Sequence, residues 1–503
     1  MLGIKELLFR MVSIPSVNST VGEIEIAKFI YNYLLELRSL SGLSDENFFV
    51  FLQDLADDDL NRKNVIAVLK GRKGYSSNAV VFLGHFDTVD IEDYGSLRDF
   101  AFDPQSLRIH MKQVCPELVR DNIEFGRGIL DMKAGIAVNI EVLKNLVENI
   151  NSWSGYAIFL FVCDEEGDSK GMINSLYFLE KIKNENSLNF LFCLNTDYTV
   201  KKAIYLGSIG KVLIGILVKG LETHVGQSLE GLNSNYILCS ILSKIEDNEY
   251  LIEHFENEFT NPPSVMKVRD LRESYNVKTN LYSFAYINHL FFNDGIADII
   301  EKYKNVANEA VKEVVFKRKK VMKKLGMNFD LLDFKVYSLG EFIDIYGNFD
   351  SYASYGFGDY REDLIVSLKN WLSGLKIDHP FVLIFLLPPY YPSVNSMNEI
   401  KTKIKEYIDR LDEKIEVYNY FPYISDLSFL GGIGECNLLK KNMLGWGKYY
   451  YLDVETINKV SMPCVDWGVL GFDAHRSTER LVVDYSLYRL PRYIKDFVMS
   501  YLV

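Results

Sequence analysis

The chain has 503 residues, with 55 Lys and Arg against 68 Asp and Glu, so its formal net charge is −13. This balance argues against a nucleic-acid-binding protein, whose affinity depends on cations that neutralise phosphates, and against electrostatic attachment to an anionic membrane. The length corresponds to roughly three domains of ordinary size, and the 48% hydrophobic and 24% charged residues exclude intrinsic disorder.

The first 200 residues alternate between helical and strand-like patterns. Helices are predicted over 24–37, 131–150 and 175–183, and strands over 64–70, 79–83, 156–162 and 190–194. Continuous apolar strands separated by helices indicate an α/β sheet covered on both faces. In such sheets, ligand-binding and active sites form at the carboxyl ends of the strands, and this chain has acidic and histidine residues at those positions.

The pattern changes from about Gly207 onward. Strands are predicted over 211–219 and 280–287, and helices over 232–245 and 306–324, which is consistent with a second α/β unit. The apolar run 381–387 is either the last strand of this unit or a strand of the first unit.

The cysteines and the N-terminal segment indicate the cellular compartment in which we expect the protein. Six cysteines without a Cys-x-x-Cys pair are too few for a disulfide scaffold, so we expect a reduced, cytoplasmic protein. Residues 1–14 are apolar at helical spacing but carry Lys5, Glu6 and Arg10, which predicts an amphipathic helix instead of a signal peptide. No run approaches the roughly 18 apolar residues of a membrane-spanning helix.

The first candidate site is Gly-His-Phe-Asp-Thr-Val, residues 84–89, directly after a predicted strand. A metal-binding histidine typically donates its second ring N–H to a carboxylate, and Asp87 could orient His85 in this way. The alternative is a loop histidine followed by an aspartate that caps a helix, and the motif alone leaves both open.

The second candidate is Asp131, within Gly-Arg-Gly-Ile-Leu-Asp-Met-Lys-Ala-Gly at 126–135. An aspartate before a helix is normally an N-cap, and this reading is favoured when the motif is taken alone. The surrounding glycines nevertheless allow unusual backbone and close approach of a ligand, so that the carboxylate could bridge two cations.

The third candidate is an acidic loop, residues 164–168, which holds four acids in five positions after strand 156–162. Like charges this close repel each other unless solvent or a cation compensates them. A solvated loop is one account. The other is that one of the pair Glu165 and Glu166 binds a metal while its neighbour is a general base.

Asp197, after strand 190–194, and His475, in Asp-Ala-His at 473–475, are weaker candidates, since each alone is more typical of a loop or solvated residue. Together the segments supply two histidines and three carboxylates, a donor set that suits Zn²⁺ better than Mg²⁺ or Ca²⁺. Two such ions bridged by an aspartate and a water make a hydrolytic site.

In this order, the motifs resemble those of the dinuclear zinc aminoacylase and carboxypeptidase family, which includes the succinyl-diaminopimelate desuccinylases. The motifs are Gly-His-x-Asp-Thr-Val, Gly-Arg-Gly-x-x-Asp-Met-Lys-x-Gly, Asp-Glu-Glu-x-x-Ser-x-Gly and Ala-His-x-x-x-Glu, and they span 84–479. Local matches at 14–18, 388–392, 421–427 and 473–475 resemble the arginine-utilization branch, the RocB type.

The resemblance implies a role for each candidate. Asp131 would bridge two zinc ions, Asp87 would orient His85, and Glu165 would be the general base. Co²⁺ or Mn²⁺ could replace zinc, and the peptide bond after Asp131 would be cis. The implied metal ligands are His85 and Asp197 on one ion, Glu166 and His475 on the other, and Asp131 on both.

The resemblance also implies an architecture: a mixed-sheet, three-layer α/β catalytic domain of the zinc-exopeptidase type, with an inserted α/β lid or dimerisation domain. We expect the catalytic domain in 1–206 and 391–503, and the insert in 207–390. In relatives, a histidine of the insert stabilises the oxyanion, often in the partner subunit, and His224 stands in that place. A homodimer through the lid would follow.

The implied function is hydrolysis of the amide bond of a small N-acyl amino acid or peptide-like substrate, related to arginine if the branch resemblance holds. A dipeptidase or aminopeptidase on the same scaffold and a non-catalytic binding protein are the alternatives. Arg269, Arg272 and Asn280 are candidates to bind a substrate carboxylate.

Overall fold

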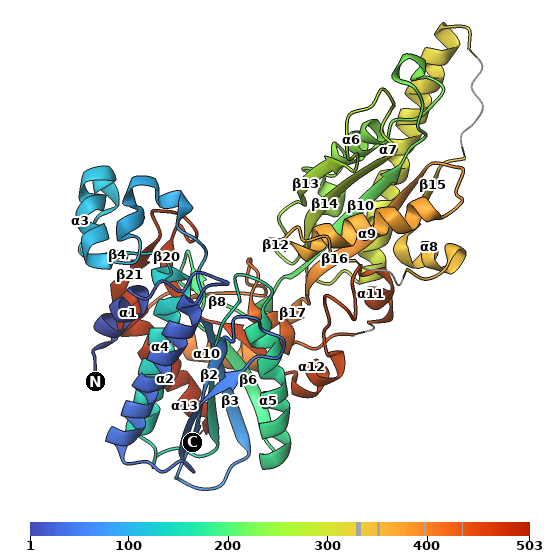
Figure 1. Cartoon of the computed structure of the whole chain (residues 1–503). Helices are drawn as coiled ribbons and strands as arrows, with labels where there is room; N and C mark the ends of the chain where they lie inside the picture. The colour runs from blue at the N-terminus through green and yellow to red at the C-terminus, as the bar shows by residue number, and fades with distance from the viewer. Residues whose placement is uncertain (328–332, 350–352, 397–398, 435, 503) are drawn as a thin grey trace. The chain divides into compact units, whose positions relative to one another are not determined.

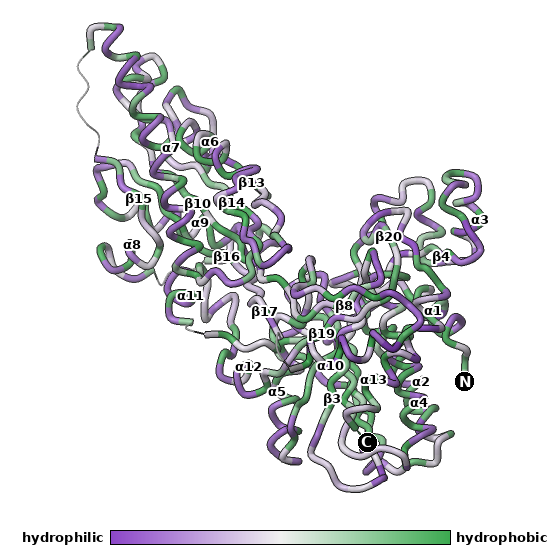
Figure 2. The backbone as a smooth tube through the Cα atoms, turned by 180° about the vertical axis from the view of Figure 1, so that it is seen from behind, coloured by the Kyte–Doolittle hydropathy of each residue, from purple (hydrophilic) through white to green (hydrophobic). Residues whose placement is uncertain are grey.

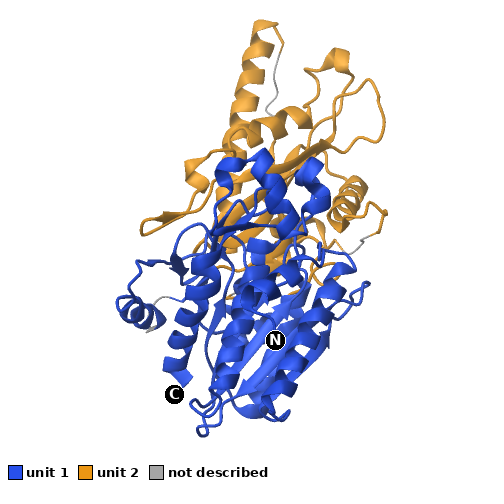
Figure 3. Ribbon diagram, turned by 90° about the vertical axis from the view of Figure 1, so that its left-hand side faces the viewer, with its two compact units in different colours: residues 1–208, 394–432, 453–503 blue, residues 209–393, 433–452 orange. Residues whose placement is uncertain are grey.

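The computed structural model describes residues 1–327, 333–349, 353–396, 399–434 and 436–502. The chain divides into two compact units, shown in Figure 3: unit 1 comprises 1–208, 394–432 and 453–503, and unit 2 comprises 209–393 and 433–452.

The return segment 433–452 differs from the expected boundaries, which assigned it to the catalytic domain. It belongs to unit 2 because Met443 pairs with Leu386 and the N–H of Leu444 donates to the carbonyl of Leu386 at 2.9 Å. The other boundaries lie close to those expected at 206/207 and 390/391.

Unit 1 is built on an eight-stranded mixed sheet with the order β1-β2-β5-β3-β6-β19-β8-β18. The central strands β5, β3, β6 and β19 are parallel to one another, whereas β2 runs antiparallel to both of its neighbours, β1 and β5. The strands are β1 (Phe48–Asp54), β2 (Lys63–Lys70), β3 (Asn78–His85), β5 (Tyr156–Val162), β6 (Asn189–Asn195), β8 (Ala203–Tyr205), β18 (Glu416–Tyr418) and β19 (Cys464–Asp466).

Helices cover both faces of this sheet (Figure 1). Val80 and Phe82 pack into the main core, and Val81 and Leu83, which point to the other face, are equally buried. The predicted α/β class is therefore confirmed. One face is covered by α2 (Gly22–Ser41), α4 (Ala134–Glu148) and α13 (Leu490–Leu502), and the other by α5 (Lys170–Asn186). Further helices of unit 1 are α1 (Ile4–Val12), α3 (Pro104–Val114), α10 (Glu399–Ile408) and α12 (Val454–Val460).

Local chemistry sets the ends of the helices. Asp103 caps α3 by accepting the N–H groups of Gln105 and Ser106, with Pro104 at the first helical position. Helix α2 ends at Gly42, whose φ of 67° is left-handed and favours glycine.

A small four-stranded sheet in unit 1 carries one loop of the candidate site. Its order is β4-β21-β20-β7, and β20 runs parallel to β7. The loop from β20 to β21 contains His475, and β7 directly follows Asp197. The strands are β4 (Ile123–Phe125), β7 (Tyr198–Thr199), β20 (Val469–Phe472) and β21 (Arg480–Val482).

Unit 2 has a five-stranded sheet with the order β13-β14-β10-β16-β15, in which the β15–β16 pair is parallel. The apolar run 381–387 lies in β16 and therefore belongs to unit 2. The strands are β10 (Gly210–Lys219), β13 (Ser264–Asp270), β14 (Tyr282–Phe291), β15 (Lys335–Ser338) and β16 (Phe381–Tyr391), and the helices are α6 (Ser234–Leu242), α7 (Ile296–Lys324), α8 (Leu339–Tyr346), α9 (Tyr360–Gly374) and α11 (Asn437–Asn442).

The hydropathy of the backbone follows this organisation, with hydrophobic residues running along the strands of each unit (Figure 2). Within the described part of the chain, no helix has the length and apolar character needed to cross a membrane.

Candidate metal centre

Three parallel strands of unit 1 bring their carboxyl ends to one edge of the sheet. His85, the last residue of β3, pairs with Val162 of β5, and Leu83 pairs with Asn195 of β6. The loops that follow these strands therefore begin side by side, as is typical of ligand sites in α/β sheets.

Two groups of possible metal ligands meet at this edge and share Asp131. Nε2 of His85 lies 3.1 Å from Oδ1 of Asp131, and Nε2 of His475 lies 3.0 Å from Oδ2. One carboxylate thus faces both groups, as a bridging ligand would. The first group is His85, Asp131 and Asp197, and the second group is Asp131, Glu166 and His475. The ligand atoms of each group lie within 4.8 Å of one another.

Asp131 does not cap the helix that follows it, since α4 begins at Ala134 and Asp131 has extended backbone angles. The N–H groups of Leu130 and Asp131 donate to Oε1 of Glu479 at 3.0 and 3.3 Å. The Asp131–Met132 peptide bond is cis, as the resemblance implied. A Cβ on Gly135 would lie 2.2 Å from the carbonyl oxygen of Thr196, so this glycine permits α4 to approach the loop that carries Asp197.

Asp87 contacts both His85 and the acidic loop. Its Oδ1 lies 3.5 Å from Nδ1 of His85, whose other close neighbour is the Asp87 carbonyl at 3.2 Å. The two carboxylate oxygens accept the N–H groups of Glu165 and Glu166 at 3.1 and 3.0 Å. The fully buried Asp87 therefore links the orientation of the imidazole to the position of the loop.

Glu165 and Glu166 are not in a solvated loop, because their side chains are only 11% and 10% exposed. Burial raises the pKa of Glu165 well above its usual range; the charge of His85 opposes this rise, and Asp426 and Glu166 add to it. Oε2 of Glu165 lies 3.8 Å from Nε2 of His85, and Glu165 belongs to neither ligand group. It is thus a carboxylate beside the candidate ligands with a high proton affinity.

The electrostatics of the cluster fit a bound cation. Burial, together with the charge of Asp131, raises the pKa of Asp197 to about 7. Burial lowers the pKa of His475, but hydrogen bonds to Asp131 and Glu166 outweigh this effect and raise the value to about 11. The carboxylates thus attract positive charge, and imidazole nitrogens with carboxylate oxygens are the donors that transition metals such as zinc prefer.

Asp426 is a buried acid near this site that is not among the candidate residues predicted from the sequence. It is 3% exposed and begins a short helical segment, Asp426–Leu430, that packs against β6. Burial raises its pKa to about 8, and its charge contributes to the raised pKa of Glu165. In the sequence, Asp426 is marked only by its position in segment 421–427, which resembles the arginine-utilization branch.

The predicted residues of the insert lie in unit 2. His224 is exposed, and its Nδ1 accepts the N–H of Gly226 at 3.1 Å. Arg269 pairs with Glu362 at 2.6 Å, and the buried Asn280 donates to the Tyr282 carbonyl at 2.7 Å. None of these residues is in the two ligand groups of unit 1, and Arg269 and Asn280 have partners within their own unit.

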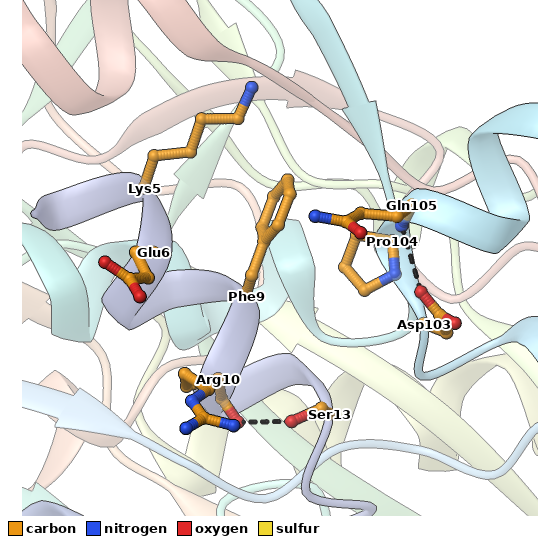
Figure 4. A pocket seen from close by; sticks show the side chains of 8 residues that line it. All are labelled: Lys5, Glu6, Phe9, Arg10, Ser13, Asp103, Pro104 and Gln105. Carbon is orange, nitrogen blue, oxygen red and sulfur yellow. Dashed lines mark hydrogen bonds between the residues drawn. The ribbon is translucent and has the colours of Figure 1, made fainter. Parts of the chain in front are cut away.

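A cavity of about 650 Å³ lies elsewhere in unit 1, between α1 and the start of α3 (Figure 4). Phe9 and Pro104 supply its apolar surface, and the charged residues Lys5 and Arg10 lie along α1. None of the candidate metal ligands lines it, so it is separate from the metal centre.

Comparison with known proteins agrees with this geometry. The model of Peptidase family M20/M25/M40 matches residues 81–447. Protein RocB of Bacillus subtilis is 30% identical over 536 aligned positions, which cover 98% of this chain and 94% of the relative.

Solved structures show the same fold at low sequence identity. Aminopeptidase PepT of Bacillus cereus has a TM-score of 0.56 at 13% identity, covering 99% of this chain and 97% of its own. A Bacillus subtilis protein described as a dinuclear metal binding peptidase from the M20 family has a TM-score of 0.55 at 12% identity, with the same coverage.

Proposed function

The chain belongs to peptidase family M20/M25/M40 and is a peptidase-type hydrolase, and we propose that it is a dinuclear zinc amidohydrolase of small amino-acid derivatives. The observation that carries the proposal is the pair of ligand groups that share Asp131. A solitary structural metal would need one such group, whereas a bridging carboxylate with a histidine on each side suits two ions.

In this proposal His85 and Asp197 would hold one zinc ion, Glu166 and His475 would hold the other, and Asp131 would be shared between the two sites. When bound, the two ions supply Lewis acidity, which lowers the pKa of a water and polarises the substrate carbonyl. Asp87 keeps the Nδ1 proton of His85 engaged, so that Nε2 is available as a ligand atom.

Glu165 moves the proton in this proposal. It accepts a proton from the attacking water and then delivers it to the leaving amine nitrogen. Its high proton affinity, which originates in burial, suits a group that must hold the proton between these two steps. Its position outside both ligand groups leaves its oxygens free for this task.

His224 donates a hydrogen bond to the oxyanion of the tetrahedral intermediate. The observation in support is its hydrogen bonding: because Nδ1 accepts the N–H of Gly226, the proton of the neutral ring is on Nε2, which can donate. The exposed position of His224 in unit 2 leaves that nitrogen accessible.

The proposed state is a cytoplasmic homodimer formed through unit 2. All six cysteines are free thiols, which supports a reducing compartment. The dimer rests on the resemblance to the aminoacylase and carboxypeptidase family, and light scattering after gel filtration would report twice the mass of one chain.

The proposed substrate is an N-acyl amino acid or a short peptide-like amide related to arginine. Its support is the local resemblance to the arginine-utilization branch together with the similarity to RocB over nearly the whole chain. Dipeptides are the second candidate class, since the fold is shared with aminopeptidase PepT.

The test is a hydrolysis screen of zinc-loaded protein over N-acyl amino acids and dipeptides, each with arginine and with leucine as the amino acid. We expect turnover of at least one arginine derivative. The Glu165→Gln variant should then lose turnover by a factor of at least about 10³ while it still binds two zinc ions, measured by elemental analysis.

The matched control is Glu185→Gln, which removes an exposed carboxylate from α5 of the same unit and should retain full turnover. Retained activity in Glu165→Gln would refute the role of this residue. A zinc-loaded protein that hydrolyses no member of either class would favour a binding protein.

A further inference from the structure

Arg62 is a buried guanidinium that meets three carboxylates in unit 1, outside both metal-ligand groups. Its side chain is only 3% exposed and lies just before β2. Nη2 lies 2.7 Å from Asp58, and Nη1 lies 3.1 Å from Glu23 and 2.6 Å from Asp164. These partners come from α2, from the loop before β2 and from the loop after β5, so one cation joins three parts of the unit.

Asp164 is the link between Arg62 and the proposed catalytic loop, because it directly precedes Glu165. Its φ of 68° is left-handed, a conformation that costs free energy for a residue with a side chain, although less for Asp and Asn than for others. Its contacts stabilise this conformation. Besides the ion pair with Arg62, its N–H donates to Oε1 of Glu23 at 3.1 Å.

Asn18 extends the network to Asp87. Its Nδ2 donates to Oδ2 of Asp87 at 2.9 Å and to Oδ1 of Asp164 at 3.2 Å. Since Asp87 accepts the N–H groups of both catalytic-loop glutamates, the first three residues of the acidic loop are all held by side chains from outside the loop. Asn18 is the last residue of segment 14–18, which resembles the arginine-utilization branch. The two hydrogen bonds that Asn18 donates are therefore a physical explanation for that local resemblance.

We propose that Arg62 is a positioning residue: through Asp164, and with Asn18 and Asp87, it fixes the turn that carries Glu165 and Glu166. The inference rests on the proposed function, since it concerns the placement of a metal ligand and a base. A purely structural ion-pair network would instead contribute to the stability of unit 1 without changing the metal centre.

The experiment titrates metal-free protein with Co²⁺ and records the visible spectrum, which reports coordination at each ion. Arg62→Lys keeps the charge but cannot reach three carboxylates with a planar fork. We expect this variant to bind one of the two Co²⁺ ions at least about tenfold more weakly, with altered absorption bands. The matched control, Arg38→Gln, breaks an exposed pair with Asp45 in the same unit and should titrate like the wild type.

A second variant keeps the test valid if Arg62→Lys fails to fold. Asn18→Leu leaves every charge in place and removes the two donated hydrogen bonds, together with the one that Asn18 accepts from the exposed Ser19 hydroxyl. It should weaken binding of the same Co²⁺ ion by a few-fold and shift the same bands. Circular dichroism establishes that each variant is folded.

Folded variants with wild-type Co²⁺ affinities and spectra would overturn the inference while leaving the proposed function intact. If the wild-type protein itself fails to bind two Co²⁺ ions, the proposed dinuclear site is refuted, and the inference about Arg62 is refuted with it. The two failures are therefore distinguishable in one titration series.

Discussion

Glu479 contacts the backbone of the candidate bridging ligand from a position that is 1% exposed. Oε1 accepts the N–H groups of Leu130 and Asp131, and Oε2 pairs with Arg127 at 2.8 Å. Burial raises the pKa of Glu479 to about 7, against the lowering effect of Arg127. The same guanidinium also pairs with Asp93 at 2.6 Å, whose side chain is 34% exposed.

The two partners of Arg127 should therefore contribute differently to the free energy of unfolding. Glu479→Gln leaves a buried guanidinium without its buried counter-charge, and we expect a loss of about 3–5 kcal/mol in the free energy of unfolding. Asp93→Asn removes the more exposed partner and should cost less than about 1 kcal/mol. Urea unfolding of both variants measures the difference, and equal losses would contradict the argument.

The candidate metal ligands that the structure brings together could be singled out in the sequence because each lies at a strand end, in the loop after a strand or in a glycine-bounded turn. The long-range ion pairs that support them could not be predicted. Arg62 meets Asp164 across 102 positions, and Arg127 meets Glu479 across 352. Such pairs depend on how distant segments pack, and an isolated arginine in a sequence is more typical of the surface.

Strand β14 in unit 2 contains an ionisable group that is buried as a neutral base. His289 is 1% exposed, and its Nδ1 lies 3.3 Å from the hydroxyl of Tyr303 on α7. Burial, with a smaller contribution from Lys302, lowers the pKa of His289 to about 3. An unfolded chain would titrate this residue near its usual value of about 6.5.

Between these two values the unfolded chain binds a proton that the folded chain does not. Stability contributed by His289 is therefore complete above about pH 6.5 and falls as the pH is lowered, by up to about 1.4 kcal/mol per pH unit. His289→Gln should remove this component of the pH dependence. Urea unfolding of unit 2 at about pH 7.5 and about pH 5 measures it.

The matched control is His254→Gln, which replaces an exposed histidine of the same unit. It should show the same pH dependence as the wild type. If His289→Gln does so as well, the buried imidazole contributes nothing to the acid sensitivity of unit 2.

At the scale of the element, the pattern predicts the buried strands β3, β5 and β6 and helices such as α2 and α7, but it misses the helices α3, α9 and α13, edge strands and several helix starts. The predicted helix 131–150 begins only at Ala134, because Asp131 and Met132 have non-helical backbone angles at the turn that presents the Asp131 carboxylate. Strand β13 was not predicted, since at the edge of its sheet none of its side chains is fully buried. At the site and at sheet edges, tertiary packing determines the backbone conformation more strongly than the local hydrophobic pattern does.

At the scale of the whole molecule, the division into two units follows from two separate cores. The core of unit 1 includes residues from both ends of the chain, such as Leu8 and Phe497, whereas Leu213, Phe385 and Leu444 belong to the core of unit 2. The insert could be expected from the change of pattern near Gly207. The return of 433–452 could not, because it depends on contacts with residues distant in the sequence: the backbone pairing with Leu386, the packing of Leu444 in the core and the hydrogen bonds of the Tyr450 hydroxyl with the backbone of Tyr390.

Both proposed ligand groups lie entirely in unit 1, and this has a thermodynamic consequence. A ligand that binds only the folded state stabilises it by about 2.7 kcal/mol at a hundredfold excess over its dissociation constant. Zinc should therefore raise the thermal midpoint of unit 1 and leave that of unit 2 unchanged. Scanning calorimetry with zinc and with a chelator would record one moving and one fixed transition.

His475→Asn provides the internal check, because it removes a ligand from only one of the two groups. The zinc-dependent rise of the unit 1 midpoint should then shrink by roughly half, since one of two sites still contributes. A single transition that moves as a whole would instead mean that the two cores unfold as one cooperative system. Binding energy gained at Asp131 would in that case stabilise the entire chain, insert included.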